Sequence, residues 1–234
     1  MGYRRILLKL SGQSLAGGSS FGLDGDTLDR HADVIGGLVE DGHEVGVVIG
    51  GGNFWRGRSS GAMDRVAADQ IGMLATVMNS LALADALDRR GIPQRLMTAV
   101  PMPTVGEAMN GRVARRYLEE GAVVIFGGGT GNPFFSTDSA AALRAAEIGA
   151  DAILMTTLVD GVYDRNPDEH PDAKLLKELT FDDVLTHQLG VMDATAAALC
   201  RDFGLTLVVF NADDLDNIRR AAEGDAIGSV VRGR

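Results

Sequence analysis

The sequence predicts an α/β protein, a three-layer α/β/α sandwich built around a mostly parallel central sheet. Short, continuous apolar runs recur along the chain, and longer segments with helical spacing of apolar residues separate them. Apolar runs without polar alternation are typical of strands buried on both faces. Because parallel strands need a helix-length connection, this alternation favours helices on both sides of one sheet.

Each apolar run is assigned to a strand in chain order, beginning with RILLKL and continuing through VGVVI, AVVIF and AILMT. The expected strands span residues 5–10, 45–49, 94–100, 122–126, 152–156, 205–210 and 228–231. The expected helices span residues 27–40, 66–89, 112–120, 137–148, 181–189, 193–203 and 215–223. The segment 159–177, rich in Asp, Asn and Pro, hints at a weak boundary near residue 150, but we expect one domain over residues 1–234 with a continuous core.

The composition is that of an acidic chain with an unexplained excess of glycine. Asp and Glu number 32 against 22 Lys and Arg, the formal charge is -10 and the pI is about 4.8. A nucleic-acid backbone would meet net repulsion, so nucleic-acid binding is not expected. Glycine accounts for 31 of 234 residues, without a collagen period or the Pro and Ser of disordered tracts. These glycines need a structural reason.

Cysteine and histidine usage points to a cytoplasmic protein without a metal site of its own. The single Cys200 excludes an internal disulfide framework, and the 4 histidines are too scattered to suggest zinc ligands. The N-terminal segment lacks the pattern of a cleaved signal, and no uninterrupted apolar run approaches the ~18 residues of a membrane span. We therefore expect neither secretion nor membrane insertion.

Glycine clusters follow three of the expected strands. Gly12 follows ILLKLS, the run 50–52 follows VGVVI, and the cluster 127–131 follows AVVIF. In open α/β sheets ligands bind beyond the carboxyl ends of the strands, where glycine lets backbone N–H groups approach an anion. A phosphate-bearing ligand is one interpretation; tight strand-to-helix turns are the other. The dipeptide Gly-Lys is absent and Trp55 stands at the third glycine of a dinucleotide motif, so neither common nucleotide motif fits.

Two further features carry candidate chemistry. Lys9, one of three lysines, interrupts an apolar strand and would be costly to bury without a charged partner. Its ammonium could contact a phosphate at the strand end, or it could extend to water from an edge strand. The segment 129–138, GTGNPFFSTD, combines hydroxyls, an amide and two aromatics. Phe134 and Phe135 could contact a base or lie in the core, and Ser136 or Thr137 could cap a helix whose N-terminus faces phosphate.

Four segments together resemble one family: KLSG at 9–12, GGGNFWRG at 50–57, GTGNPFFSTDSAA at 129–141 and VDGVYDRNP at 159–167. With them the chain resembles the bacterial UMP kinases, also called uridylate kinases, of the amino acid kinase superfamily. The resemblance runs from residue 4 to about residue 231. It implies transfer of the ATP γ-phosphoryl group to UMP, with Mg²⁺ bound mainly through ATP. UMP would bind over the part at about 1–150 and ATP over the part at about 151–234.

The resemblance also assigns roles to residues by position. It implies catalytic roles for Lys9, Asp138 and Asp193. The implied ATP-binding residues are Lys9, Leu10, Ser11, Gly12, Gly52, Arg56, Thr157, Tyr163 and Asn166. The implied UMP-binding residues are Gly51, Asp69, Thr130, Gly131, Asn132, Pro133, Phe134, Phe135, Ser136 and Thr137. Family members are usually hexamers, and the apolar helix expected at 67–87 suits an interface or a doubly buried core helix.

Some positions depart from the family pattern. Met155 and Leu158 stand in a segment where many members carry lysine, and Ala84 and Asp88 stand where enterobacterial relatives place Arg and His that contact GTP. The resemblance therefore does not predict GTP activation here. Two alternatives remain open: a kinase for another small phosphate or carboxylate acceptor, and a non-catalytic nucleotide-binding or oxyanion-binding relative.

Overall fold

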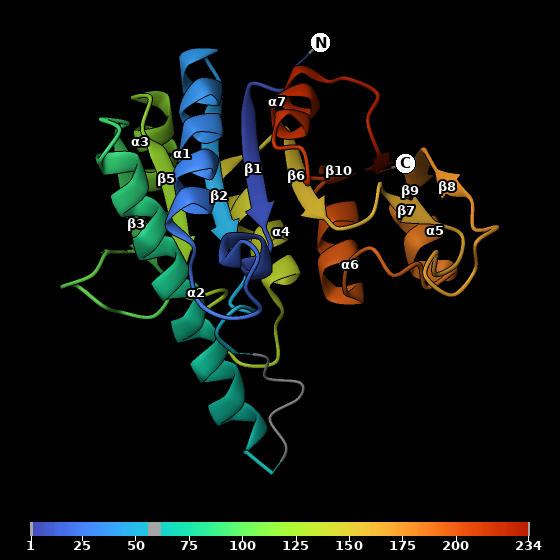
Figure 1. Cartoon of the computed structure of the whole chain (residues 1–234), viewed down its shortest axis with the longest axis horizontal. Helices are drawn as coiled ribbons and strands as arrows, with labels where there is room; N and C mark the ends of the chain where they lie inside the picture. The colour runs from blue at the N-terminus through green and yellow to red at the C-terminus, as the bar shows by residue number, and fades with distance from the viewer. Residues whose placement is uncertain (1, 56–61, 234) are drawn as a thin grey trace.

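The computed structural model describes residues 2–55 and 62–233, and its centre is a large sheet with helices on both faces (Figure 1). Within these residues the strand order of the 9-stranded sheet is β4-β3-β5-β2-β1-β6-β10-β11-β9. Neighbouring strands are parallel except for the antiparallel pair β10 and β11. The strands are β1 (Arg5–Leu10), β2 (Glu44–Ile49), β3 (Gln94–Thr98), β4 (Glu107–Ala108), β5 (Val123–Gly127), β6 (Ala152–Thr157), β9 (Glu178–Thr180), β10 (Thr206–Asn211) and β11 (Ser229–Arg232). The expected α/β/α sandwich is confirmed.

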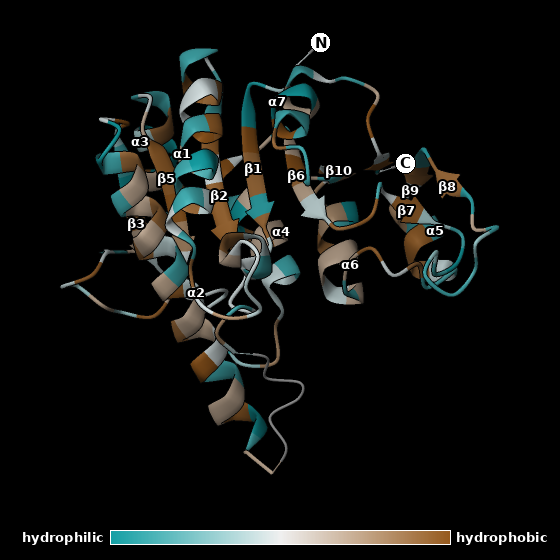
Figure 2. Ribbon diagram, viewed as in Figure 1, coloured by the Kyte–Doolittle hydropathy of each residue, from teal (hydrophilic) through white to brown (hydrophobic). Residues whose placement is uncertain are grey.

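Helices cover the two faces in separate groups. The helices are η1 (Gly12–Ala16), α1 (Gly25–Glu40), α2 (Arg65–Asp88), α3 (Gly111–Glu119), α4 (Thr137–Ile148), α5 (Phe181–Thr186), α6 (Ala194–Asp202) and α7 (Asp216–Glu223). One core packs α1, α2 and α7 against the sheet, and the other packs α3 to α6. Figure 2 shows the central strands as predominantly apolar, as burial on both faces requires.

The alternation of side chains along β1 decides where its lysine points. Leu8 and Leu10 belong to the core under α1, whereas Leu7 belongs to the core under α4. Successive strand residues face opposite sides of a sheet. Lys9 therefore lies on the α4 side, at the carboxyl end of a central strand rather than an edge strand. This excludes the alternative in which it extends to water from a sheet edge.

The departures from the expected elements are short or terminal. The strand expected to reach residue 100 ends at Thr98, and the helix expected to reach residue 189 ends at Thr186. The short strands β4, β9, β7 (Val162–Tyr163) and β8 (Leu175–Leu176) were not expected, because two or three residues carry no periodic signal. β7 and β8 form a separate antiparallel ladder. The main sheet continues across residue 150 through the pairing of β1 with β6.

Helix α2 has the length and hydropathy of a membrane span by composition alone. Its polar residues Thr76, Asn79 and Ser80 are nevertheless buried in the protein, and it packs against β3, β5 and α1. A helix that buries amide and hydroxyl groups against a sheet is a core helix of the fold. Its opposite side remains apolar and exposed at Leu74 and Met78.

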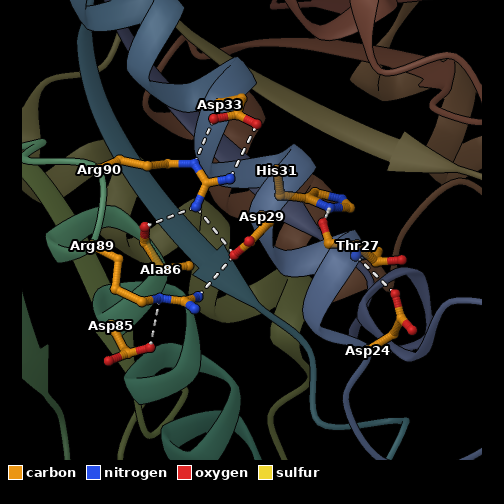
Figure 3. A network of polar contacts seen from close by, with 9 residues as sticks. All are labelled: Asp24, Thr27, Asp29, His31, Asp33, Asp85, Ala86, Arg89 and Arg90. Atoms are coloured by element: carbon orange, nitrogen blue, oxygen red, sulfur yellow. Dashed lines mark hydrogen bonds and ion pairs between the residues drawn. The ribbon is translucent and has the colours of Figure 1, made fainter.

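An ion-pair network joins the end of α2 to the outer side of α1 (Figure 3). Arg89 contacts Asp29 at 2.8 Å, and Arg90 contacts Asp29 at 3.1 Å and Asp33 through both carboxylate oxygens. The hydrogen bond from Arg90 lowers the pKa of Asp33. Because Asp33 is 62% exposed, its pairing contributes little to stability, but the network fixes where α1 lies beside α2.

Candidate active site

The carboxyl ends of β1, β2 and β5 surround a cavity of about 370 Å³, here called the first cavity. Parallel strands place the turns that follow them at one edge of the sheet, so the three glycine clusters meet there. Its lining includes most of the residues assigned from sequence: Lys9, Ser11, Gly12, Gly51, Gly52, Asp69, Thr130, Asn132, Phe135, Ser136, Thr137 and Asp138. Segments more than a hundred residues apart in the chain thus form one pocket.

Lys9 forms an ion pair in this cavity. Its Nζ lies 2.9 Å from Oδ1 of Asp138, in the first turn of α4. The side chains are 15% and 23% exposed, so both charges are partly withdrawn from water and compensate each other. The N-terminus of α4 also faces the cavity, and the positive end of its helix dipole favours an anion. This arrangement holds an oriented ammonium beside a helix N-terminus, which suits a phosphate.

The first glycine turn depends on a close approach between two loops. A Cβ at Gly12 would lie 2.3 Å from the carbonyl oxygen of Gly50 and 2.6 Å from Oδ1 of Asn53. Asn53 and Asn79 exchange side-chain hydrogen bonds of 2.9 and 2.8 Å, and Asn79 also donates to the Gly50 carbonyl at 2.6 Å. Both amides are buried, at 1% and 0% exposed. This pair fixes the Gly50 turn against Gly12 and α2.

The turn after β5 is held by buried side chains from two helices. Gly128 has φ of 82° and donates its N–H to Oγ1 of Thr76 at 2.9 Å. A side chain is disfavoured at that φ, which gives this glycine its reason. Arg144, only 4% exposed, donates to the Gly129 carbonyl at 3.1 Å. The loop toward Thr130 is therefore anchored from α2 and α4 before any ligand is present.

Asp69 lines the first cavity and is hydrogen-bonded to Phe134, which lies on the adjoining loop outside the lining. The N–H of Phe134 donates to Oδ2 of Asp69 at 2.8 Å, and Nε of Arg65 contacts that carboxylate at 2.9 Å. Phe134 has φ of 73°, an uncommon conformation for a residue other than glycine, and its ring is 65% exposed under the Arg65 guanidinium. Backbone strain of this kind, held by a side chain, is concentrated at ligand sites.

Asp193 lies behind the cavity lining rather than in it. It caps α6 through the Ala196 N–H at 3.0 Å, and it accepts hydrogen bonds from the hydroxyls of Ser136 and Ser139. Ser136 in turn caps α4 through the N–H groups of Asp138 and Ser139. Asp193 thus orients the residue that begins α4, so its predicted catalytic role takes the form of a positioning role.

Two further cavities, each of about 460 Å³, follow the first in succession. The second cavity lies between α1 and the carboxyl end of β6, and it shares Lys9 and Ser11 with the first. The third cavity lies between the loop after β6 and the loop after α5. It includes the predicted residues Thr157, Tyr163 and Asn166 and shares Thr157 with the second. The two cavities thus connect the Tyr163 region to Lys9.

The remaining predicted residues are placed differently. Leu10 is 1% exposed in the core under α1, and its carbonyl accepts the Gly50 N–H, so its side chain is not part of the site. Gly131, Pro133 and Phe134 belong to the loop that carries Thr130 but do not line the first cavity. Arg56 lies outside the described residues.

Comparisons with known proteins identify the family of the chain. Residues 4–211 match the amino acid kinase family. The chain belongs to the amino acid kinase family. Its structure is similar to that of a UMP kinase from Bacillus anthracis, with 38% identity, a TM-score of 0.95 and coverage of 99% of this chain and 97% of that chain. A UMP kinase from Ureaplasma parvum is 37% identical, with a TM-score of 0.92 and coverage of 99% and 100%.

A third solved structure extends the likeness to a more distant relative. A uridylate kinase from Archaeoglobus fulgidus is 25% identical, with a TM-score of 0.72 and coverage of 99% of this chain and 100% of that chain. The likeness in fold thus extends over 99% of this chain in a third solved structure.

Several residues of this family member's site were not found from sequence. Asn79, Thr76 and Arg144 hold the glycine turns, and Trp55 donates from Nε1 to the Ala68 carbonyl at 2.9 Å, joining the Gly50 turn to α2. Asn79, Thr76 and Arg144 lie outside the four motif segments, and each of the four residues bonds a residue at least thirteen positions away. Buried polar residues within the apolar stretch of α2 were the only available signal.

His31 on α1 is a buried titratable group whose effect on stability has a definite sign. It is 3% exposed, its Nδ1 lies 2.8 Å from the Thr27 carbonyl, and burial lowers its pKa from 6.5. The unfolded chain therefore binds this proton more readily. Stability is complete above about pH 6.5 and falls as the pH drops from there toward the lower folded pKa. We expect His31→Gln to flatten this decline in urea unfolding at pH 7.5 and 5.5.

The matched control for that measurement is the exposed His170. His170→Gln should leave the difference in unfolding free energy between the two pH values as in the unmodified protein. An unchanged pH dependence in His31→Gln would contradict the assignment of a neutral, buried imidazole at this position.

Proposed function

We propose that this protein transfers the γ-phosphoryl group of ATP to UMP, giving ADP and UDP. One observation carries the proposal: Lys9 and Ser11 line both the first cavity and the second. A phosphoryl group bound at these two residues is therefore accessible to a ligand in either cavity. The glycine turns and the α4 N-terminus converge on that point. The UMP kinases similar to this chain over 99% of its length support UMP as the acceptor.

The residue types suit phosphoryl transfer without a general base. The attacking oxygen belongs to the UMP phosphate, which is already ionised near neutral pH. Catalysis then depends on positioning and on neutralising the charge of the transferring group. Lys9 supplies the charge, Asp138 orients it at 2.9 Å, and the N–H groups of Gly12 and the α4 N-terminus supply fixed dipoles. An overall charge of -10 does not oppose this local field.

The two substrates would occupy opposite ends of the cavities. UMP fits the first cavity, formed by the part at about 1–150, where Asp69 and the loop after Gly129 supply polar contacts. The ATP adenosine fits the third cavity, formed by the part at about 151–234, beside Tyr163 and Asn166. The glycine turns between the two ends would then supply backbone N–H groups to the phosphates.

Mg²⁺ would enter with the nucleotide. The described residues include no group of three or more His, Cys, Asp or Glu side chains that could hold a metal by themselves. Mg²⁺ keeps several waters and binds phosphate oxygens with one or two carboxylates, and Asp213 lines the second cavity. The donor set therefore fits a nucleotide-borne ion. When bound, Mg²⁺ neutralises charge on the ATP phosphates.

An ADP-release assay with MgATP tests the acceptor. UMP, CMP, dTMP, carbamate and acylated amino acids are supplied in turn, and we expect UMP to give the highest kcat/KM. Preference for any other acceptor would assign the chain to another kinase of the family. ATP binding without ADP release for any acceptor would assign it to a non-catalytic nucleotide-binding protein.

Asp69→Asn should raise the KM for UMP about tenfold or more and leave the KM for ATP nearly unchanged. The carboxylate accepts the Phe134 N–H, and asparagine can still accept it but without the charge. A hydrogen bond to a charged group contributes ~1.5–3 kcal/mol, more than a neutral one, so the substitution should weaken UMP binding. Initial rates with each substrate varied in turn measure both constants. Asp85→Asn, on the exposed side of the same helix, is the control. A raised KM for ATP with an unchanged KM for UMP would contradict the assignment of Asp69 to the UMP site.

Self-association is also part of the proposal. The exposed side of α2 carries Ile71, Leu74, Met78 and Leu81 at 37 to 49% exposed, one turn apart in succession. A contiguous apolar stripe of this kind is typical of an interface. We propose that it joins copies of this chain in a hexamer, and light scattering of the purified protein would give the mass. A cytoplasmic location stays a prediction.

A further inference from the structure

The second cavity lies on the path of the donor's phosphates, and this inference rests on the proposed function. The first cavity shares no lining residue with the third, but the second shares Lys9 and Ser11 with one and Thr157 with the other. A donor with its adenosine in the third cavity and its γ-phosphoryl group at Lys9 must therefore lay its triphosphate across the second. The far wall of that cavity is α1, which neither the sequence nor the comparisons assign to the site.

The α1 wall is organised around one residue, Thr27. Its carbonyl is bonded by Nδ1 of His31 at 2.8 Å, its hydroxyl accepts from Nη2 of Arg30 at 3.0 Å, and its N–H donates to Asp24 at 2.8 Å. Figure 3 shows Asp24 and His31 meeting the backbone of Thr27. Thr27 is 4% exposed and His31 3%. Side chains anchored in this way are oriented before a ligand binds.

The wall also presents polar atoms that lack protein partners. The bond to Thr27 uses Nδ1 of His31 and leaves Nε2 with no hydrogen bond to the described residues. Nε2 is not among the described buried atoms that lack a partner, so it is open to the cavity, where a polar ligand or water can bond it. Gln13 adds a further donor to the lining, whereas the Ser14 hydroxyl already donates to the Ser11 carbonyl at 2.7 Å.

The charges of the two donor cavities single out Arg30. Lys9 is paired with Asp138, and Arg165 in the third cavity lies near Asp164 and Asp172 at 3.7 and 3.6 Å. Arg30 has no carboxylate within 4.0 Å among residues 2–55 and 62–233, although Asp24 and Asp213 lie in its surroundings. Arg30 is thus an exposed guanidinium at the cavity wall, bonded to Thr27 and with donors left over. A guanidinium in this state suits a phosphate, which it can bind through two parallel hydrogen bonds.

We propose that Arg30 binds the triphosphate of the donor nucleotide from the α1 side of the second cavity. The part of the lining at the end of β6, Thr157 and the following Leu158, carries no charge, so the positive charge of this cavity comes from Arg30 on α1 and from Lys9. Arg30 contributes to binding of the donor nucleotide. It does not contribute to binding of the acceptor, because the acceptor lies in the first cavity, on the other side of Lys9. The role differs from a structural one because it depends on the ligand's phosphates.

Kinetics and equilibrium binding of Arg30→Gln test this role. The glutamine can still donate to the Thr27 hydroxyl, so the change removes charge with little disturbance of α1. We expect the KM for MgATP to rise about tenfold or more, the usual effect of losing a charge-assisted hydrogen bond, while the KM for UMP changes less than about twofold. The dissociation constant for ADP should rise similarly and that for adenosine should not. Arg30→Lys should recover part of the ATP affinity.

Arg115→Gln, an exposed arginine on α3 at the other face, is the matched control and should behave as the unmodified protein. An unchanged KM for ATP and unchanged ADP binding in Arg30→Gln, with active unmodified enzyme, would overturn the inference and leave the proposed function intact. Equal loss of ADP and adenosine binding would also overturn it, because the effect would not depend on phosphate. If the unmodified protein binds ADP but transfers nothing to UMP, the proposed function fails and the binding comparison still decides the role of Arg30.

Discussion

Lys9→Met is expected to lower kcat by at least ~100-fold, the loss typical of removing one preorganised donor from a developing charge. Lys9 lines the first and second cavities and stands between the two proposed substrates. Methionine keeps the length and apolar stem of the side chain but carries no charge. The interaction lost is made most strongly in the transition state, so kcat should fall more than either KM rises.

This substitution should leave the fold intact. It frees Asp138, whose side chain is 23% exposed and remains open to water through the cavity, so no charge is sealed in the core. Circular dichroism and urea unfolding check this directly. Lys177→Met, at an exposed lysine far along the chain, is the control for loss of charge alone. Turnover near that of the unmodified protein would remove Lys9 from the transfer centre.

The sequence contained enough to predict the layers and the edge where the site lies. Buried strands such as β2 carry no polar residue except at their start, which identifies them in the sequence. The glycines at Gly12, Gly50 and Gly127 mark the ends of three such strands, although these ends lie far apart in the chain. Parallel pairing alone then brings them together. Lys9 lies on the α4 side of the sheet, and this follows from the alternation of side chains along β1 once both neighbouring strands are known.

Other parts of the site depend on tertiary contacts that no local pattern encodes. The pair of Asn53 and Asn79 joins a turn to the middle of a helix, and its hydrogen bonds become apparent only when α2 is placed beside the turn. The φ of 73° at Phe134 is likewise imposed by Asp69, 65 residues away. Leu10 was carried over as a motif position, and the alternation of β1 places its side chain in the core, so any ATP contact that it makes is through its backbone.

Gly12→Ala is expected to lower both the free energy of unfolding and the kcat/KM for ATP. Among the glycines of the site, we expect this substitution to have the largest effect on both quantities. The new methyl carbon would lie 2.3 Å from the Gly50 carbonyl oxygen and 2.6 Å from Oδ1 of Asn53. Neither atom can move freely, because Asn79 holds both of them through hydrogen bonds. Overpacking of this kind typically costs ~1–3 kcal/mol of unfolding free energy.

The catalytic loss should exceed what that destabilisation explains at 25 °C, because a protein that is still folded would have its first glycine turn displaced from the Gly50 turn. The N–H of Gly12 would then point away from the phosphate between Lys9 and Ser11, and a small misplacement of a positioning group costs on the order of 100-fold. Urea unfolding and kcat/KM for ATP measure the two effects separately. Gly18→Ala, where an added Cβ meets nothing within 4 Å, should change neither. A Gly12→Ala protein with unchanged kcat/KM would show that the two turns can separate without loss of the transfer geometry.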